Sequence, residues 1–345
     1  MQRRTALSVM AATAALAAVT VTGCSADSTA ATKDGTTTVT LALDWTPNTN
    51  HTGIYIAQAK GWFKAAGINV KIVPYGSTAP ETLIANHKAD FGISYQEGIT
   101  TARAAGQDIT SVYAVTQKTD VTIAVRADRS DVTTPKDLDG KTYAGFGAPY
   151  EKPLLQKVIQ NAGGRGEFKQ VTLNTSAYAA LYAGKADFAM PMPTWEGLEA
   201  KLSGKPLKNF QLSDYGFPAI YSTLVASSDQ FLKKNPGVAK KFLAAVDKGY
   251  RYAAEHPSQA ADLLISQNKS VLTNTKLVKE SEALLAKEYY KGADGSIGTQ
   301  SAERWQAFAD FEYKAGLLVD ADGKKLTSAP KASTFFTNAY LPDAK

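Results

Sequence analysis

The stretch TVTLALDWTPNTNHTGIYIAQAKGWFKAAG, residues 38–67, decides the fold because its hydrophobic pattern changes from that of a strand to that of a helix. Thr38 to Leu43 is rich in β-branched and apolar residues and predicts a strand. The apolar spacing from Gly53 to Ala65 predicts a helix that closes at Gly67. Between them lies a polar loop, Asp44 to Gly53. A strand, a loop and a helix in this order form the repeating unit of an α/β domain with a largely parallel sheet.

The same alternation continues along the chain. In the first cycle we predict strands at 70–73, 90–94, 111–115 and 121–125, with helices at 79–86 and 97–105. A second cycle opens at Lys136, with strands predicted at 142–144, 171–173, 187–190 and 221–226 and helices at 151–161, 177–183 and 195–202. The remainder is mostly helical, over 236–255, 257–267, 275–287 and 301–315. The fold class is therefore α/β.

A weak internal repeat predicts two related lobes. LIANHKADFG, residues 83–92, resembles LYAGKADFA, residues 181–189. In each copy a helix ends, Lys-Ala-Asp turns the chain and a buried strand begins. We assign residues 36–123 and 226–345 to lobe one and residues 124–225 to lobe two. The two chain crossings, near Val121–Val125 and Tyr221–Ala226, would form the hinge.

The N-terminus has the pattern of an export signal. Two arginines are followed by a small, apolar segment rich in alanine and valine, which ends in Val-Thr-Gly before Cys24. We predict a lipoprotein signal peptide at 1–23, lipidation of Cys24, a flexible tether at 24–35, and anchoring at the outer face of the bacterial cytoplasmic membrane. The alternative is an ordinary secretory leader that happens to contain a cysteine. Whether export uses the general or the twin-arginine route is left open.

Composition excludes several function classes. The formal net charge is only +6 over 345 residues, and no basic run is interleaved with aromatics, so nucleic acid is not expected as a partner. Cys24 is the single cysteine, so an internal disulfide is not expected. His51, His87 and His256 lack metal-ligand spacing, so we predict neither a metal site nor a cofactor.

Ligands of open α/β sheets bind beyond the carboxyl ends of the strands. Polar and aromatic side chains are concentrated there, and we predict that the ligand is bound by Asp44, Trp45, Asn48, Asn50, His51, Tyr95, Gln96, Glu97, Tyr150, Glu151, Trp195 and Glu196. Aromatic faces with carboxylates and amides suit a flat, nitrogen-rich ring, whereas an anion would need arginine. There are simpler explanations: lone aromatics are often core residues, the three glutamates each begin a predicted helix, and His51 could cap a turn.

The segment Leu43 to Tyr55 resembles the thiamine-pyrimidine precursor-binding family of ABC transporters (ThiY-type). The similarity continues through Ala57–Phe63, Asp90–Glu97 and Gly147–Glu151. The resemblance implies a type II periplasmic-binding-protein fold and a small-molecule ligand, formylaminopyrimidine or hydroxymethylpyrimidine. It also implies permease and ATPase subunits as partners. We expect a monomer that closes its lobes on the ligand and makes or breaks no bond.

Two departures bear on the ligand and the activity. The second-lobe motif MPMPTWE, residues 190–196, replaces a more aromatic run in the pyrimidine binders, so riboflavin or another small molecule is an alternative ligand. A sulfonate is less favoured because the motifs lack basic groups. The superfamily also contains a fungal enzyme that builds the pyrimidine from its own histidine and pyridoxal phosphate. Its lysine and histidine fall at Ser94 and Gly98 here, which argues against an enzyme.

Overall fold

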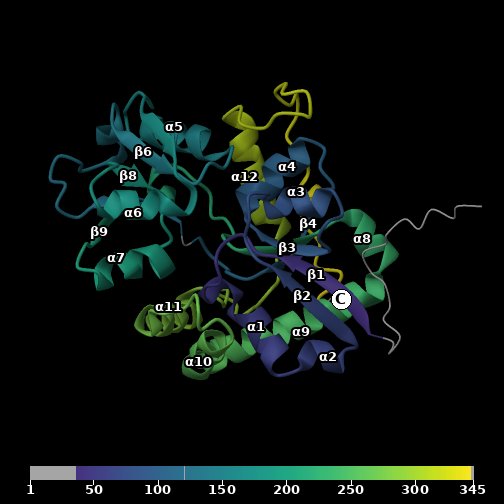
Figure 1. Cartoon of the computed structure of the whole chain (residues 1–345). Helices are drawn as coiled ribbons and strands as arrows, with labels where there is room; N and C mark the ends of the chain where they lie inside the picture. Colours follow the sequence, from purple (N-terminus) through teal and green to yellow (C-terminus); the bar gives the residue numbers. More distant parts are fainter. Residues whose placement is uncertain (1–35, 120, 343–345) are drawn as a thin grey trace, which may run out of the picture.

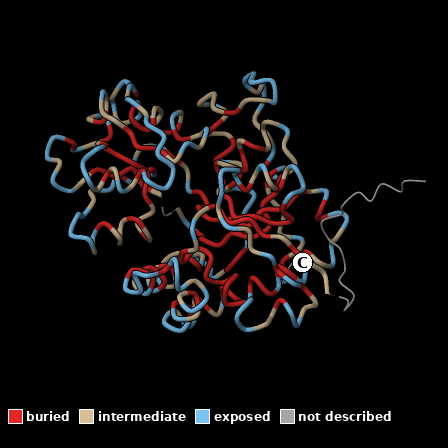
Figure 2. Tube along the Cα trace, in the orientation of Figure 1, coloured by how far each residue is buried: buried red, intermediate tan, exposed pale blue. Residues whose placement is uncertain are grey.

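The computed structural model describes residues 36–119 and 121–342 and contains two five-stranded sheets (Figure 1). The predicted signal peptide, Cys24 and the whole of the predicted tether lie outside the described residues. We call the part built on the first sheet lobe one and the part built on the second sheet lobe two. Buried stretches of the chain run through the centre of each lobe (Figure 2). In the described part of the chain, no helix is long and apolar enough to cross a membrane.

The sheet of lobe one has the strand order β2-β1-β3-β10-β4. Its strands are β1 (Thr37–Ala42), β2 (Ile68–Val73), β3 (Phe91–Ser94), β4 (Thr110–Ala114) and β10 (Leu224–Ser227). Strand β1 is parallel to β2 and β3, whereas β10 is antiparallel to β3 and β4. The connecting helices are α1 (Thr52–Ala59), α2 (Trp62–Ala65), α3 (Pro80–Ala85) and α4 (Gln96–Ala104). The prediction of one continuous helix over 53–65 was wrong, because Gly61 adopts a left-handed conformation that separates α1 from α2.

The sheet of lobe two has the order β7-β6-β8-β5-β9. Its strands are β5 (Thr122–Arg126), β6 (Thr142–Gly145), β7 (Lys169–Thr172), β8 (Phe188–Ala189) and β9 (Leu207–Gln211), and its helices are α5 (Glu151–Asn161), α6 (Ala177–Tyr182) and α7 (Leu198–Leu202). The sequence prediction missed β9, an edge strand that is mostly polar. The predicted helix at 195–202 is in fact a π-helical turn, η4 (Pro193–Gly197), followed by α7.

The predicted internal repeat is confirmed by matching hydrogen bonds in the two lobes. In lobe one, the Asp90 amide donates to the Thr40 carbonyl at 3.0 Å, and the Asp90 carboxylate accepts from the Thr40 amide at 2.7 Å. In lobe two, the Asp187 amide and carboxylate make the same pair of bonds with Thr142, at 2.9 and 2.8 Å. Each aspartate thus ties the start of the central strand of its sheet, β3 or β8, to the neighbouring parallel strand, β1 or β6.

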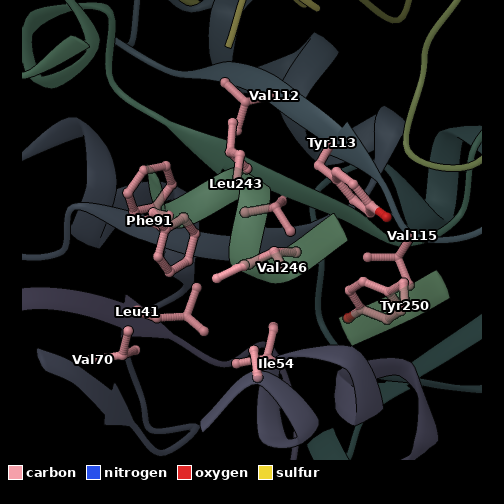
Figure 3. Close-up of a cluster of buried hydrophobic side chains, with 14 of the residues drawn as sticks. Leu41, Ile54, Val70, Phe91, Val112, Tyr113, Val115, Leu243, Val246 and Tyr250 are labelled. Atoms are coloured by element: carbon pink, nitrogen blue, oxygen red, sulfur yellow. The ribbon is translucent and has the colours of Figure 1, made fainter. Parts of the chain in front are cut away.

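The C-terminal helices mostly cover lobe one. They are α8 (Asp229–Lys234), α9 (Pro236–Glu255), α10 (Pro257–Gln267), α11 (Thr275–Glu288) and α12 (Ala302–Lys314). Side chains from α9, α1 and the first sheet fill a core that includes Leu41, Ile54, Phe91, Val246 and Tyr250 (Figure 3). Helices α1 and α9 approach closely at two glycines, since a Cβ on Gly249 would lie 1.9 Å from the Gly53 carbonyl oxygen. This packing fixes α1 and the loop before it.

The chain crosses between the sheets after β4 and again before β10. The predicted boundaries at 123/124 and 225/226 fall inside β5 and β10, which each pair within one sheet only. Helix α12 contacts both lobes: Trp305 and Ala309 pack in a core of lobe one, and Phe308 packs in the core of lobe two. How the lobes move about these connections stays a prediction.

Candidate ligand site

A cavity of about 70 Å³ lies between the two lobes at the carboxyl ends of their central strands, and we call it the inner cavity. Ten of the twelve predicted site residues line it: Asp44, Trp45, Asn48, Asn50, Tyr95, Glu97, Tyr150, Glu151, Trp195 and Glu196. The other two, His51 and Gln96, are buried behind the wall. The rule that ligands bind beyond the carboxyl ends of the strands therefore selected residues most of which lie together in the structure.

The loop after β1 forms the lobe-one wall and is held by its own side chains. Asn48 caps the short helix η1 (Thr49–His51) by accepting a hydrogen bond from the Asn50 amide at 2.8 Å. His51 Nδ1 accepts from the Asn48 amide at 3.3 Å, so the ring proton is on Nε2, which donates to Asp44 at 2.9 Å. His51 is fully buried. It therefore acts as a cap and as a support for Asp44, and it does not line the inner cavity, contrary to the sequence prediction.

Helices far away in sequence hold the same loop from behind. The Tyr250 hydroxyl donates to the Asn50 carbonyl at 2.7 Å, and the Tyr290 hydroxyl lies 3.1 Å from the Thr49 carbonyl. The Thr49 hydroxyl contacts the Ser281 hydroxyl at 2.6 Å. Every one of these groups is buried. The lobe-one wall is therefore a preformed surface, because its backbone carbonyls are fixed by side chains of α9, α11 and the segment after α11.

Glu282 on α11 completes this backing, and its surroundings favour the protonated form. Four oxygen-to-oxygen contacts of 2.5–3.1 Å join Thr52, Tyr290, Glu282 and the Thr49 carbonyl, but the two hydroxyls supply only two hydrogens. A proton on Glu282 lets it donate to Thr52, while Thr52 donates to the Thr49 carbonyl. Burial raises the pKa of Glu282 to about 8, in agreement with this hydrogen count.

Carboxylates hold the lobe-two wall through local hydrogen bonds. Glu151 accepts from the amides of Phe146 and Gly147, both at 3.0 Å, and so shapes the loop after β6. Glu196 accepts from the Met192 amide at 3.0 Å within the π-helical turn. Burial raises the pKa of Glu151, whereas these backbone donors favour its ionised form. The lobe-two wall is thus set by contacts between residues four or five positions apart.

Aromatic side chains join the two walls. The Trp45 ring of lobe one lies 5.2 Å from the Phe146 ring and 6.0 Å from the Tyr178 ring of lobe two, measured between centroids. Tyr95 and Tyr150 meet edge to face across the cleft at 6.3 Å. Trp195 packs against a cluster of α10 and α11 residues in lobe one. The lobes therefore contact each other around the inner cavity.

The polar groups of the inner cavity are acidic or neutral. Among the described residues that line it, none is lysine, arginine or histidine. Asn50 is buried, and its side-chain oxygen accepts no hydrogen bond from the described residues, although its amide group contacts the Met192 sulfur at 3.4 Å. A buried acceptor without a donor costs free energy, which a ligand N–H would offset.

Six further residues line the inner cavity that the sequence analysis did not single out: Val121, Phe146, Tyr178, Met190, Met192 and Ser222. The two methionines stand in the segment 190–196 that was identified, and Phe146 follows the strand predicted at 142–144, so position at the end of a strand was an available signal. Tyr178 lies in α6, and nothing in the apolar spacing of that helix distinguishes it from the other helical residues. Its hydroxyl donates to the Met190 carbonyl at 3.2 Å.

A second cavity of about 300 Å³ adjoins the first, and we call it the outer cavity. Asp44, Tyr95, Phe146 and Tyr150 line both cavities. Gly98 lines the outer cavity, and the fully buried Ser94 donates a hydrogen bond to Glu81, which also lines it. At these two positions the chain therefore has a hydroxyl and an open backbone instead of the lysine and histidine of the pyrimidine-building enzyme.

Two α/β lobes with the same strand order, connected by two crossings and enclosing a cavity, define a type II periplasmic-binding-protein fold. The solved Candida albicans CA3427 gene product, described as having the generic form of this fold, matches with a TM-score of 0.65 at 18% identity, covering 87% of this chain and 96% of that one. The family model described as NMT1/THI5 like matches residues 48–260. The chain belongs to this family.

Two curated relatives differ in their described activities. A formylaminopyrimidine-binding protein of Halalkalibacterium halodurans is 29% identical over 284 residues, covering 81% of this chain and 85% of the relative. A 4-amino-5-hydroxymethyl-2-methylpyrimidine phosphate synthase of Saccharomyces cerevisiae is 25% identical over 234 residues, covering 64% of this chain and 68% of the relative. The chain is thus similar to a binding protein over more of its length than to the synthase.

Proposed function

We propose that this protein is the solute-binding lipoprotein of an ABC importer and that it binds a thiamine pyrimidine precursor, formylaminopyrimidine or hydroxymethylpyrimidine. The observation that carries the proposal is the inner cavity, which offers aromatic faces and carboxylates without a basic side chain. A flat ring with exocyclic amine groups satisfies both, because its faces contact aromatic rings and its N–H groups donate to oxygens. Similarity to a formylaminopyrimidine-binding protein supports the same ligand class.

Each wall supplies a different part of the recognition. On lobe one, His51 holds the Asp44 carboxylate and Tyr250 holds the Asn50 backbone carbonyl, so both residues are positioned to offer a side-chain oxygen to the ligand. On lobe two, the Phe146 and Tyr178 rings approach Trp45 from the other side of the cleft. We propose that lobe closure brings these surfaces onto the ligand and that permease and ATPase subunits recognise the closed form.

The proposal includes export and a lipid anchor at Cys24, both supported by the pattern of residues 1–24. It does not include catalysis. Positions 94 and 98 hold a serine and a glycine where the related enzyme would need a lysine and a histidine, and the similarity to the synthase extends over less of the chain. A sulfonate ligand is disfavoured because the described residues around the inner cavity include no cation to pair with it.

Calorimetric titration of the chain from residue 25 tests the function directly. The titrants are formylaminopyrimidine, hydroxymethylpyrimidine, riboflavin and taurine. We expect tight binding of a pyrimidine, with roughly thirtyfold weaker binding in Trp45→Ala, about 2 kcal/mol, and a clear loss in Glu97→Gln. Glu255→Gln, an exposed site on α9, is the control for a change of charge. Heat from riboflavin or taurine with none from either pyrimidine would show that the ligand assignment is wrong.

A further inference from the structure

The outer cavity is lined by its own set of side chains, which a single small ring bound in the inner cavity would not contact. It is roughly four times as large as the inner cavity, about 300 against 70 Å³. Its lining includes two carboxylates, Asp44 and Glu81, and among the described residues that line it none is basic. Both carboxylates therefore face a cavity to which the surrounding side chains supply no positive charge.

Aromatic rings form another part of the outer cavity. Tyr75 lies 5.7 Å from Phe146 and 6.0 Å from Trp45 between ring centroids, and Tyr95 and Tyr150 line both the outer cavity and the inner one. Aromatic faces beside carboxylates are the surroundings that organic cations prefer, because the negative face of each ring and the carboxylate charge both attract the cation.

Glu81 is placed to contact such a cation. It lies in the first turn of α3 and is half-buried, and it accepts a hydrogen bond from the fully buried Ser94 hydroxyl. Burial raises the pKa of Glu81, and the negative charge of Asp44 raises it further. A cation bound between the two carboxylates would offset both costs. Gly98 keeps this space open, since a Cβ there would lie 3.0 Å from the Glu81 oxygen.

We propose that the outer cavity is a second subsite of the ligand site and takes an organic cation, joined by a short link to the ring that the inner cavity holds. Four residues line both cavities, so the two spaces adjoin, and a ligand with a short link can reach from one into the other. The inference rests on the proposed function for the position of the ring and extends it to a ligand of two parts. The specificity of the outer cavity is for charge, through Glu81, and for a flat or quaternary group, through Tyr75 and Phe146.

Thiamine and its neutral deaza analogue are a matched pair of probes, because they share a pyrimidine and a one-carbon link and differ in the positive charge of the second ring. We expect the wild-type protein to bind thiamine about tenfold or more tightly than the deaza analogue. Glu81→Gln should reduce this preference to within about threefold, since the amide keeps an acceptor for Ser94 but loses the charge. Glu255→Gln should leave it unchanged. Equal affinity for the two probes in the wild-type protein, or a preference that survives Glu81→Gln, would overturn the proposal.

A second variant and a third probe separate the possible failures. Thr101→Leu, on the α4 side of the outer cavity, should weaken both two-ring probes and leave hydroxymethylpyrimidine unchanged. Binding of hydroxymethylpyrimidine without either two-ring probe would overturn the cation subsite but not the proposed function. If no pyrimidine binds, the proposed function has failed, and trimethylthiazolium then tests the subsite alone. Binding of trimethylthiazolium to the wild-type protein and not to Glu81→Gln would support the cation subsite. Absence of that binding overturns both.

Discussion

The two walls of the inner cavity differ in where their support comes from. The lobe-one loop is held by Tyr250, Ser281 and Tyr290, which stand two hundred or more residues further along the chain. The lobe-two loops are held by Glu151 and Glu196, which bond to amides four or five residues away. Long-range support makes lobe one a preformed half of the site. Because the lobe-two loops are supported locally, their detailed conformation can change without a change in the strand order of the sheet.

The carboxylates Glu282 and Glu151 also differ in the hydrogen-bonding groups that surround them. Glu282 faces hydroxyls that need a donor, whereas Glu151 faces backbone amides that can only donate. A neutral amide side chain should therefore replace one and not the other. The following substitutions test this difference, beginning with the largest effect.

Glu282→Gln should become more stable relative to the wild-type protein as the pH rises. The folded protein keeps the Glu282 proton up to a pKa of about 8, whereas the unfolded chain releases it near the ordinary glutamate pKa of 4.5. The folded state therefore binds the extra proton between these values, and the wild-type free energy of unfolding falls across this window and is constant above it. Glutamine has no proton to lose, so the variant should gain on wild type by on the order of 4 kcal/mol between pH 5 and pH 9. Urea unfolding at several pH values measures the gain, and parallel curves for the two proteins would show that Glu282 is ionised.

Glu151→Gln should have the opposite sign. Its amide group would face the amide of Phe146 or Gly147, which removes one hydrogen bond and places two donors together. We expect a loss of about 2 kcal/mol in the free energy of unfolding at pH 7, together with weaker ligand binding. Urea unfolding and calorimetry measure the two effects. A variant as stable as wild type would mean that the local carboxylate does not hold the lobe-two wall.

Removing one hydroxyl from each side gives the smallest and most direct comparison. Tyr290→Phe deletes a buried hydroxyl that contacts Glu282 and the Thr49 carbonyl, and it should cost about 1 kcal/mol of stability. Tyr182→Phe deletes a half-buried hydroxyl that donates to the Glu196 carbonyl, and it should cost less than about 0.5 kcal/mol. Thermal unfolding of the two variants side by side gives the difference. A larger loss of stability in Tyr182→Phe than in Tyr290→Phe would contradict the conclusion that lobe one provides the preformed wall.

The alternation of strands and helices predicted both sheets and most of the inner cavity, because the ligand loops follow strands whose pattern is strong. The same reasoning missed the backing of lobe one. Glu282 lies in a helix whose spacing indicates an ordinary amphipathic surface, and its burial follows from the packing of α11 against the loop after β1. The sequence reasoning also predicted that His51 contacts the ligand. A buried capping residue and a ligand-binding residue occur in the same polar loop, and the sequence pattern does not distinguish them. The outer cavity depends on the placement of α3 against lobe two, which no local pattern encodes.

Hydrogen exchange with and without hydroxymethylpyrimidine tests the central claim, that a preformed lobe-one wall and a locally supported lobe-two wall close on one ring. The account predicts slow exchange of the amides in 48–56 already in the free protein, with little change on binding. It predicts faster exchange in 145–148 and 191–197 in the free protein and strong protection there when the ligand is added. Protection confined to the lobe-one loop, or no protection in either wall, would contradict it.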